Sequence, residues 1–237
     1  MTTNSTTIEP ILCPNPPFRP PPTAYNGIVT ISVSKDDTGE AIVFRAFRGV
    51  LSYYSRIFGE LLVNEWAGND TVKLDNVSPH VFSTFHFWLP TGNFCMPDIA
   101  PDDRWQFFVD ACQFAYVYDI YAFENRILDA FYHALTKEPY ISVETMATIY
   151  NDTADTPLLR EVLASWVLQF YGSGYQDMTW VYQHRVHNDL AWDVLKLSYM
   201  QKKAVGYLNS APNVDVDKHV QDMKEGFCAT YHNHDGE

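Results

Sequence analysis

The chain has 237 residues, 46% of them apolar and 15% aromatic, which is enough for a substantial core and too apolar for a disordered polypeptide. Its 16 Lys and Arg against 29 Asp and Glu give a net charge of −13, which argues against direct nucleic-acid binding because phosphates require clustered positive charge. No apolar run approaches the roughly 20 residues of a membrane-spanning helix, and no basic segment followed by an apolar stretch forms a signal peptide, so we expect an intracellular protein, of the cytoplasm or nucleus, without membrane contact.

Residues 1–25 form a leader with six prolines between positions 14 and 22. Proline lacks a backbone donor and fixes φ, so we expect this leader to be extended or disordered and not helical. Two roles stay open for it: a flexible segment, or a polyproline ligand for another module.

Strand patterns cluster near the N-terminal side of the remaining chain. Val29, Ile31 and Val33 alternate with polar residues, the period of two that is typical of a half-buried strand. The polar run 35–40 predicts a hairpin loop, and residues 41–45 predict a second strand. A third short strand is expected at residues 71–74.

Helical spacing dominates the rest of the chain up to residue 137. Ser78 and Pro79 predict the start of a helix, and Gly92 predicts its left-handed C-terminus. Two more amphipathic helices are expected around residues 105–116 and 123–135. The positions expected to face the core are Val50, Leu51, Tyr54, Phe58, Phe82, Phe85, Trp88, Leu89, Trp105, Phe108, Val109, Cys112, Tyr116, Ile127, Leu128 and Phe131.

Beyond Pro139 only helical patterns occur, including one that starts at Pro157 and a weaker one around residues 190–200. We expect a core at residues 26–137, a helical extension at 138–208 packed on that core, and a flexible acidic tail at 209–237. Strands early and helices late indicate an α+β fold rather than alternating βαβ units.

Eight residues in three blocks share their order and spacing with one family of domains. They are Phe44, Leu51, Ser55, Phe58, Phe82, Trp88, Gly92 and Ala115. In these blocks the sequence resembles a BTB/POZ domain, of the fungal type with a C-terminal helical segment. The resemblance implies a small sheet of about three strands flanked by helices, and a protein-interaction module that acts as a scaffold or adaptor.

The chain departs from the family pattern at several positions. Phe47 stands where the family has His, and Gly27 and Ile28 stand where an Asp is expected. The prolines at 14–22 forbid the helix that precedes the first strand in many dimeric members. A swapped homodimer of the animal type is therefore not expected, although another copy of the chain stays among the candidate partners. Pro90, in place of Tyr, is expected to end its helix early.

One short motif suggests a more specific role. Val63, Asn64 and Glu65 follow the Ser-x-x-Phe helix, where BTB adaptors of cullin-RING ubiquitin ligases often carry an apolar-x-Glu turn. The resemblance implies that Val63 would fill a pocket on the cullin while Glu65 pairs at its rim. The competing interpretation is a packed Val beside a solvated Glu.

No pattern of catalytic residues or nucleotide-binding glycines occurs, so we expect no enzyme activity, no cofactor and no metal. The four cysteines lack metal-ligand spacing and are expected to be structural or inert thiols. The two histidine pairs with suggestive spacing could bind a metal, but we expect them to be solvated, since zinc usually takes four ligands. These residues are Cys13, Cys95, Cys112, Cys228, His184, His187, His232 and His234.

Overall fold

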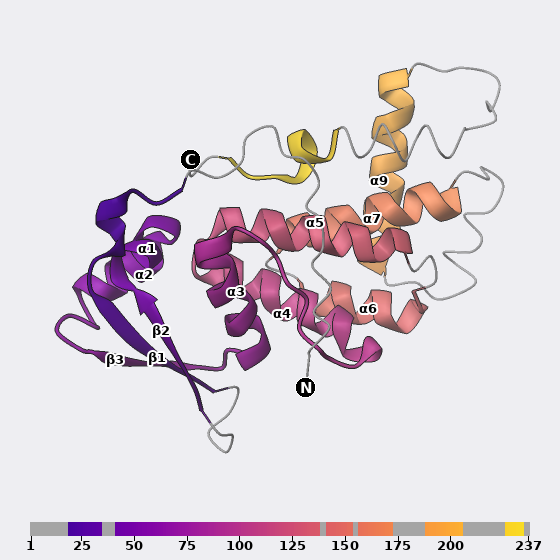
Figure 1. The fold of residues 1–237 in the computed structure, drawn as a ribbon. Helices are drawn as coiled ribbons and strands as arrows, with labels where there is room; N and C mark the ends of the chain where they lie inside the picture. The colour runs from indigo at the N-terminus through magenta and orange to yellow at the C-terminus, as the bar shows by residue number, and fades with distance from the viewer. Residues whose placement is uncertain are drawn as a thin grey trace. The chain divides into compact units, whose positions relative to one another are not determined.

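The computed structural model describes residues 19–34, 41–137, 141–153, 156–172, 188–205 and 226–234 (Figure 1). The chain forms two compact units, the first of Met1–Ala130 with Asn233–Glu237 and the second of Phe131–His232. The first unit combines a sheet with helices, which confirms the α+β class. In the part of the chain that is described, no helix is long and apolar enough to cross a membrane.

The sheet has the strand order β2-β1-β3. Strand β1 (Ile28–Ser34) pairs antiparallel with β2 (Ile42–Phe47) and parallel with β3 (Thr71–Asp75). The antiparallel pair is the predicted hairpin, whose loop at 35–40 lies outside the described residues. Val29, Ile31 and Val33 are fully buried, as their alternation predicts.

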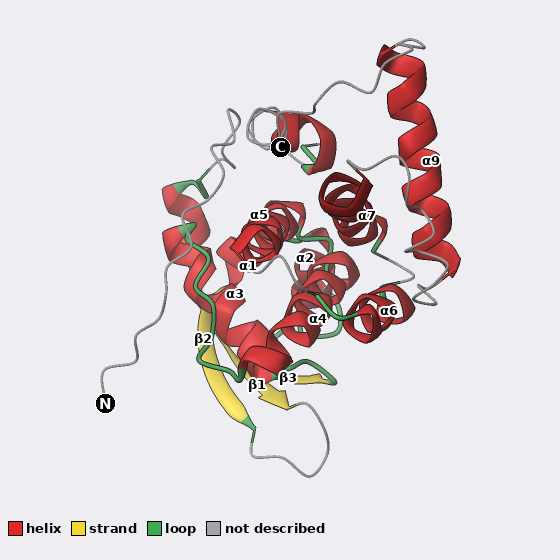
Figure 2. Ribbon diagram, turned by 90° about the vertical axis from the view of Figure 1, so that its right-hand side faces the viewer, coloured by secondary structure: helices red, strands yellow, loops and turns green. Residues whose placement is uncertain are grey.

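The helices of the first unit gather on one side of this sheet (Figures 1 and 2). In chain order they are η1 (Pro22–Tyr25), α1 (Arg48–Tyr54), α2 (Arg56–Val63), α3 (Pro79–Thr91), η2 (Pro101–Asp103), α4 (Arg104–Val117) and α5 (Tyr121–Lys137). Helix α5 continues into the second unit. That unit also contains α6 (Val143–Asp152), α7 (Pro157–Gly172), α9 (Asn188–Val205) and a helical stretch at residues 226–231.

A cluster of aromatic rings forms the centre of the first unit. Phe85 on α3 lies 5.7 Å from Phe82, 5.2 Å from Phe114 and 5.3 Å from Phe123, measured between ring centroids. The rings meet edge-on or tilted, the arrangement that aromatic quadrupoles favour, and such pairs contribute about 0.5–1.5 kcal/mol beyond their buried area. This cluster joins α3, α4 and α5 into one core.

The end of the proline-rich leader differs from the expectation. Residues 1–18 lie outside the described part of the chain, but Pro22–Tyr25 form a 3₁₀ helix with Pro22 at its first position. A proline is tolerated there because the first amide of a helix has no intrahelical partner. The prediction of a non-helical leader is therefore wrong for these four residues.

Pro90 does not shorten its helix. Helix α3 runs through Pro90 to Thr91, and the Gly92 amide donates to the Trp88 carbonyl at 2.7 Å. Gly92 has φ +67° and ends the helix in the predicted left-handed conformation. Pro90 lacks the amide that would donate to residue 86, so one intrahelical bond is lost, but the helix continues to Thr91 and ends at the glycine.

The end of the core and the C-terminal tail also differ from the expected segments. The first unit closes at Ala130, whereas the sequence predicts a core that ends at 137. Within the expected flexible tail, residues 226–231 are helical and bury Phe227, Cys228 and Tyr231, since an aromatic stripe at helical spacing can be removed from water by folding. The packing of the extension on the core stays a prediction.

Gly49 marks a close approach between α1 and η1. A Cβ on Gly49 would overlap the Ala24 carbonyl oxygen and lie 2.8 Å from the Ala24 Cα, whereas a Cβ on Gly59 in α2 would lie no closer than 3.6 Å to any neighbour. The contact at Gly49 is with backbone, so it cannot be relieved by a side-chain rotation.

We predict that Gly49→Ala destabilises the fold by about 1–3 kcal/mol, the usual range for overpacking. Gly59→Ala is the matched control and should be neutral or stabilising by up to about 1 kcal/mol, because alanine favours a helix interior. Urea unfolding followed by tryptophan fluorescence measures both. Equal midpoints for the two variants would contradict the close approach.

Candidate protein-interaction surface

The eight residues that carry the family resemblance have structural positions. Most are buried in the first unit, Phe44 is half-buried, and Gly92 ends α3. The fully or nearly fully buried members are Leu51, Ser55, Phe58, Phe82, Trp88 and Ala115. These residues build the core, so a binding surface must be sought beside them.

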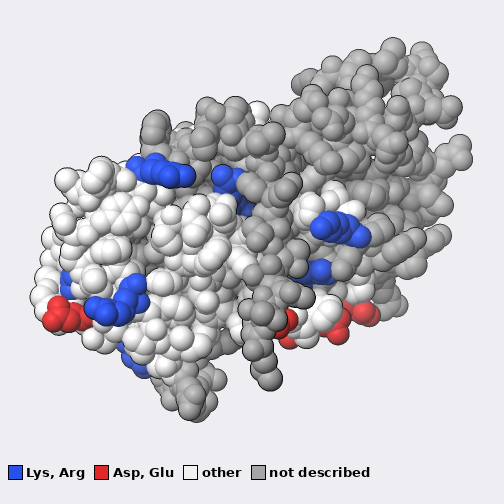
Figure 3. Space-filling model, in the orientation of Figure 1, with Lys and Arg blue, Asp and Glu red and all other residues white. Residues whose placement is uncertain are grey.

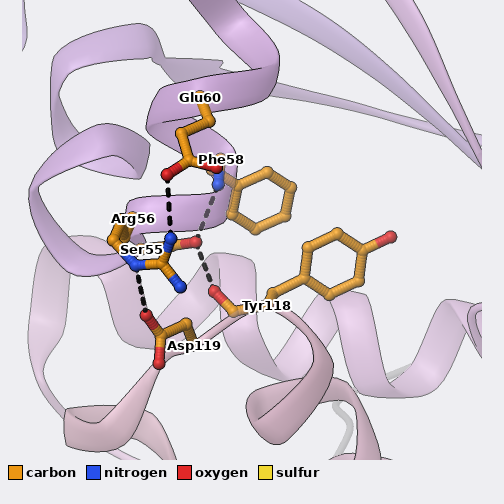
Figure 4. A network of polar contacts seen from close by, with 6 residues as sticks. All are labelled: Ser55, Arg56, Phe58, Glu60, Tyr118 and Asp119. Carbon is orange, nitrogen blue, oxygen red and sulfur yellow. Dashed lines mark hydrogen bonds and ion pairs between the residues drawn. The ribbon is translucent and has the colours of Figure 1, made fainter.

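Ser55 joins α2 to the turn that follows α4. Its hydroxyl oxygen accepts a hydrogen bond from the Phe58 amide at 2.9 Å, which caps α2, and its hydroxyl proton is donated to the Tyr118 carbonyl (Figure 4). Ser55 is both the C-cap residue of α1 and the N-cap residue of α2. Phe58 also stacks on Tyr118, with ring centroids 4.6 Å apart. The start of α2 is thereby fixed to this turn.

Arg56 adds two charged contacts on the outside of the same junction. Its guanidinium donates to Glu60 at 2.8 Å and to Asp119 at 3.2 Å (Figure 4). The hydrogen bond to Glu60, followed by the attraction of both carboxylates, raises the Arg56 pKa. The hydrogen bond with Asp119 is also the main cause that raises the Tyr121 pKa. Arg56 and Glu60 are both largely exposed, and Arg56 is the exposed partner of the less exposed Asp119. Such pairs contribute little stability and chiefly orient the side chains.

Val63 continues the face of α2 on which Arg56 and Glu60 lie. The three positions are spaced i, i+4 and i+7, which places them on one side of a helix, while Phe58 and Leu62 point into the core. The Val63 side chain is 75% exposed, so the competing interpretation of a packed Val is wrong. Asn64 caps the helix through its amide, which donates to the Glu60 carbonyl at 3.0 Å.

Glu65 lies in the turn directly after α2 and is exposed. The structure therefore presents both residues of the apolar-x-Glu motif, Val63 and Glu65, to solvent. An exposed apolar side chain next to an exposed carboxylate can fill a pocket on a partner while the carboxylate pairs with a cation at its rim.

The sequence did not indicate that two further apolar side chains near this junction are exposed. Tyr116, expected to face the core, is 52% exposed, and Val117 is 61% exposed. They close α4 two and three residues before Asp119, which contacts Arg56. Tyr116 continues the helical spacing of Cys112, but in the last turn of α4 only Phe114 and Ala115 are buried, whereas Tyr116 and Val117 are exposed. The α2 surface is hereafter the set Arg56, Glu60, Val63, Glu65, Tyr116 and Val117.

Phe47, which stands where BTB/POZ sequences have a histidine, lies at the boundary of β2 and α1. Its ring meets that of Tyr25 edge-on, with centroids 5.4 Å apart. An apolar pair at this position carries no charge that could form the ionic groove expected of many animal BTB dimers.

The cysteines and histidines also have definite environments. Cys112 is a free, fully buried thiol whose pKa is raised by burial and then by the nearby Glu124. That it is inert stays a prediction. Cys95 is free and half-buried. Cys13, His184 and His187 lie outside the described residues.

Positive charge is dispersed on the face drawn in Figure 3, where the described Lys and Arg side chains lie apart from one another. The full sequence has 16 such residues against 29 acidic ones. That the chain does not bind nucleic acid stays a prediction.

Comparison with known proteins does not identify a family for this chain. No protein-family model matches the sequence, and no curated protein matches it at a significant level. Membership of the BTB/POZ family therefore stays a prediction.

We predict that Ser55→Ala destabilises the chain by about 2–3 kcal/mol, because it removes a helix cap and leaves the part-buried Tyr118 carbonyl without its donor. Ser52→Ala is the matched control, since the Ser52 hydroxyl is exposed and only donates to the Arg48 carbonyl within its own helix; it should change stability by less than about 0.5 kcal/mol. Denaturant unfolding measures the free energy of unfolding of both variants. Similar losses of stability in the two would contradict a stabilising role of the Ser55 hydrogen bonds.

Glu124 generates a pH-dependent prediction. This carboxyl group in the first turn of α5 is 5% exposed, and burial raises its pKa from 4.5 to about 7. The native state therefore binds the proton more tightly than the unfolded state, and stability should fall as pH rises from about 4.5 to about 7, by up to about 3 kcal/mol.

We expect Glu124→Gln to remove this contribution, so that its stability relative to wild type increases between pH 4.5 and pH 8. Glu65→Gln, which alters an exposed carboxylate, is the control and should track wild type throughout. Denaturant midpoints measured across this pH range test the effect. A constant difference between Glu124→Gln and wild type would exclude it.

Proposed function

We propose that the chain is a non-enzymatic protein-interaction module of the BTB/POZ type, acting as a scaffold or adaptor inside the cell. Three lines support this proposal: the α+β architecture, the order of the eight motif residues along the chain, and an exposed apolar surface on a rigid junction. Its partner would be another protein, with a second copy of the chain as one candidate.

The α2 surface is the observation that carries the proposal. Val63, Tyr116 and Val117 are all more than half exposed, and each belongs to a segment anchored by Ser55, Phe58 or Tyr118. Binding surfaces on rigid elements lose little conformational entropy when a partner docks. Val63 lies on the same face of α2 as Arg56 and Glu60, and an apolar side chain beside charged ones is a common feature of protein interfaces.

A second, more specific function is supported by Val63 and Glu65 together. We propose that an adaptor of a cullin-RING ubiquitin ligase would use Val63 as the apolar anchor and Glu65 as the charged contact. Both side chains are exposed, as such docking requires. Substrate recruitment would then fall to the helical extension at 138–208 or to the proline-rich leader.

We predict that Val63→Asp and Glu65→Lys each weaken binding to the N-terminal region of the host's BTB-binding cullin by at least about 30-fold, the effect of losing a hot spot worth about 2 kcal/mol. Val43→Asp is the matched control, because Val43 is also an exposed valine, 61% exposed, and lies on β2. Isothermal titration calorimetry with the purified full chain measures the affinities of the wild type and of the three variants.

Absence of wild-type binding at tens of micromolar would remove the adaptor role and leave the broader module. That broader proposal is tested by size-exclusion chromatography with light scattering, alone and with captured partners. It would fail if wild type stayed monomeric and captured the same proteins as Val63→Asp.

A further inference from the structure

One sulfur and two imidazole nitrogens converge near residue 230. The ligand atoms of Cys228, His232 and His234 all lie within 4.8 Å of one another. All three residues come from one stretch of seven consecutive residues, so the cluster is a property of this local stretch. From the sequence alone we expect solvated histidines and an inert thiol here, because zinc usually takes four ligands.

The helix at residues 226–231 brings the first two ligands together. Cys228 and His232 are spaced i and i+4, which places side chains on the same helical face. The amide of His232 donates to the Cys228 carbonyl at 3.1 Å, so the helical hydrogen-bond pattern continues through His232. The sulfur and the imidazole are therefore neighbours because of the backbone conformation.

Asn125 fixes the backbone between the two histidines. Its side-chain amide donates to the Asn233 carbonyl, and its side-chain oxygen accepts from the Asn233 amide, both at 2.9 Å. A carboxamide that bonds both groups of one residue holds that residue's peptide planes in a single orientation. His232 and His234 are the residues on either side of this fixed point.

The helix that carries Cys228 is firmly packed in the second unit. The Phe227 ring lies 4.9 Å from that of Tyr132 and 4.8 Å from that of Tyr231. The Tyr231 hydroxyl donates to the Ser165 hydroxyl at 2.6 Å. Cys228 is 5% exposed, and His232 and His234 are half-buried. Ligands held in this way are preorganised and partly shielded from water.

Thiolate and imidazole are the ligands that zinc prefers in proteins. In a tetrahedral zinc site with bonds of about 2.0–2.3 Å, neighbouring ligand atoms lie roughly 3.3–3.6 Å apart. The ligand atoms, which lie within 4.8 Å of one another, would have to approach by at most about 1.5 Å, which rotation of the side chains can supply. We propose that Cys228, His232 and His234 bind one Zn²⁺, with the fourth position taken by water or by a ligand from a partner.

Binding of the ion would release the Cys228 thiol proton to solvent, since the thiolate is the ligand. The bound metal would cross-link the end of the helix at 226–231 to the following residues. Its effect is therefore expected to be structural, and it does not depend on the proposed interaction function.

The test is a titration of the reduced, full-length protein with Co²⁺, followed by displacement with Zn²⁺. The wild type should bind one equivalent of Co²⁺ and develop a thiolate-to-cobalt charge-transfer absorption, which Zn²⁺ then abolishes. Cys228→Ala should lose the charge-transfer band, and His234→Gln should weaken binding at least tenfold. His234 is half-buried, so its replacement keeps the test valid if Cys228→Ala fails to fold.

Cys95→Ala and His80→Gln are the matched controls, because they remove a free thiol and an imidazole that lie outside the cluster. Both should titrate as wild type does. The proposal is overturned by substoichiometric binding, by binding without a charge-transfer band, or by equal losses in cluster and control variants.

Discussion

A single buried hydroxyl, that of Ser55, connects segments 63 residues apart in the sequence. It caps α2 through the Phe58 amide and donates to the Tyr118 carbonyl. Phe58 then stacks on Tyr118 and enters the aromatic cluster around Phe85. The direction of α2, and hence everything that α2 presents to solvent, depends on this contact. A buried polar group that satisfies both of its partners specifies one arrangement and makes alternatives costly.

The two faces of α2 differ, one packing in the core and the other facing solvent. Its inner side contributes Phe58 and Leu62 to the core, and its outer side carries Arg56, Glu60 and Val63. Arg56 forms ion pairs with Glu60 and Asp119, whereas the apolar side chain of Val63 can form none. The exposed Val63 side chain is therefore the position at which the proposed partner would dock.

Much of the first unit could be predicted because its signals are local. The alternation at Val29, Ile31 and Val33, the cap at Ser55 and the left-handed Gly92 each depend on a few neighbouring residues. Pro90 and Tyr116 were misjudged because position within a helix, which the sequence pattern does not give, decides whether a proline breaks it or an aromatic is buried. The convergence of Cys228 with His232 and His234 needed the helix at 226–231, which polar surroundings obscure.

The central claim, that Val63 lies at the contact with a partner, can be tested by site-specific photo-crosslinking. A photoreactive amino acid would replace Val63 in one protein and Val43, also exposed, in another, and both would be irradiated in host extract and with the purified cullin region. The account predicts a discrete crosslinked species from position 63 and none from position 43. No adduct from position 63, or the same adducts from both positions, would contradict it.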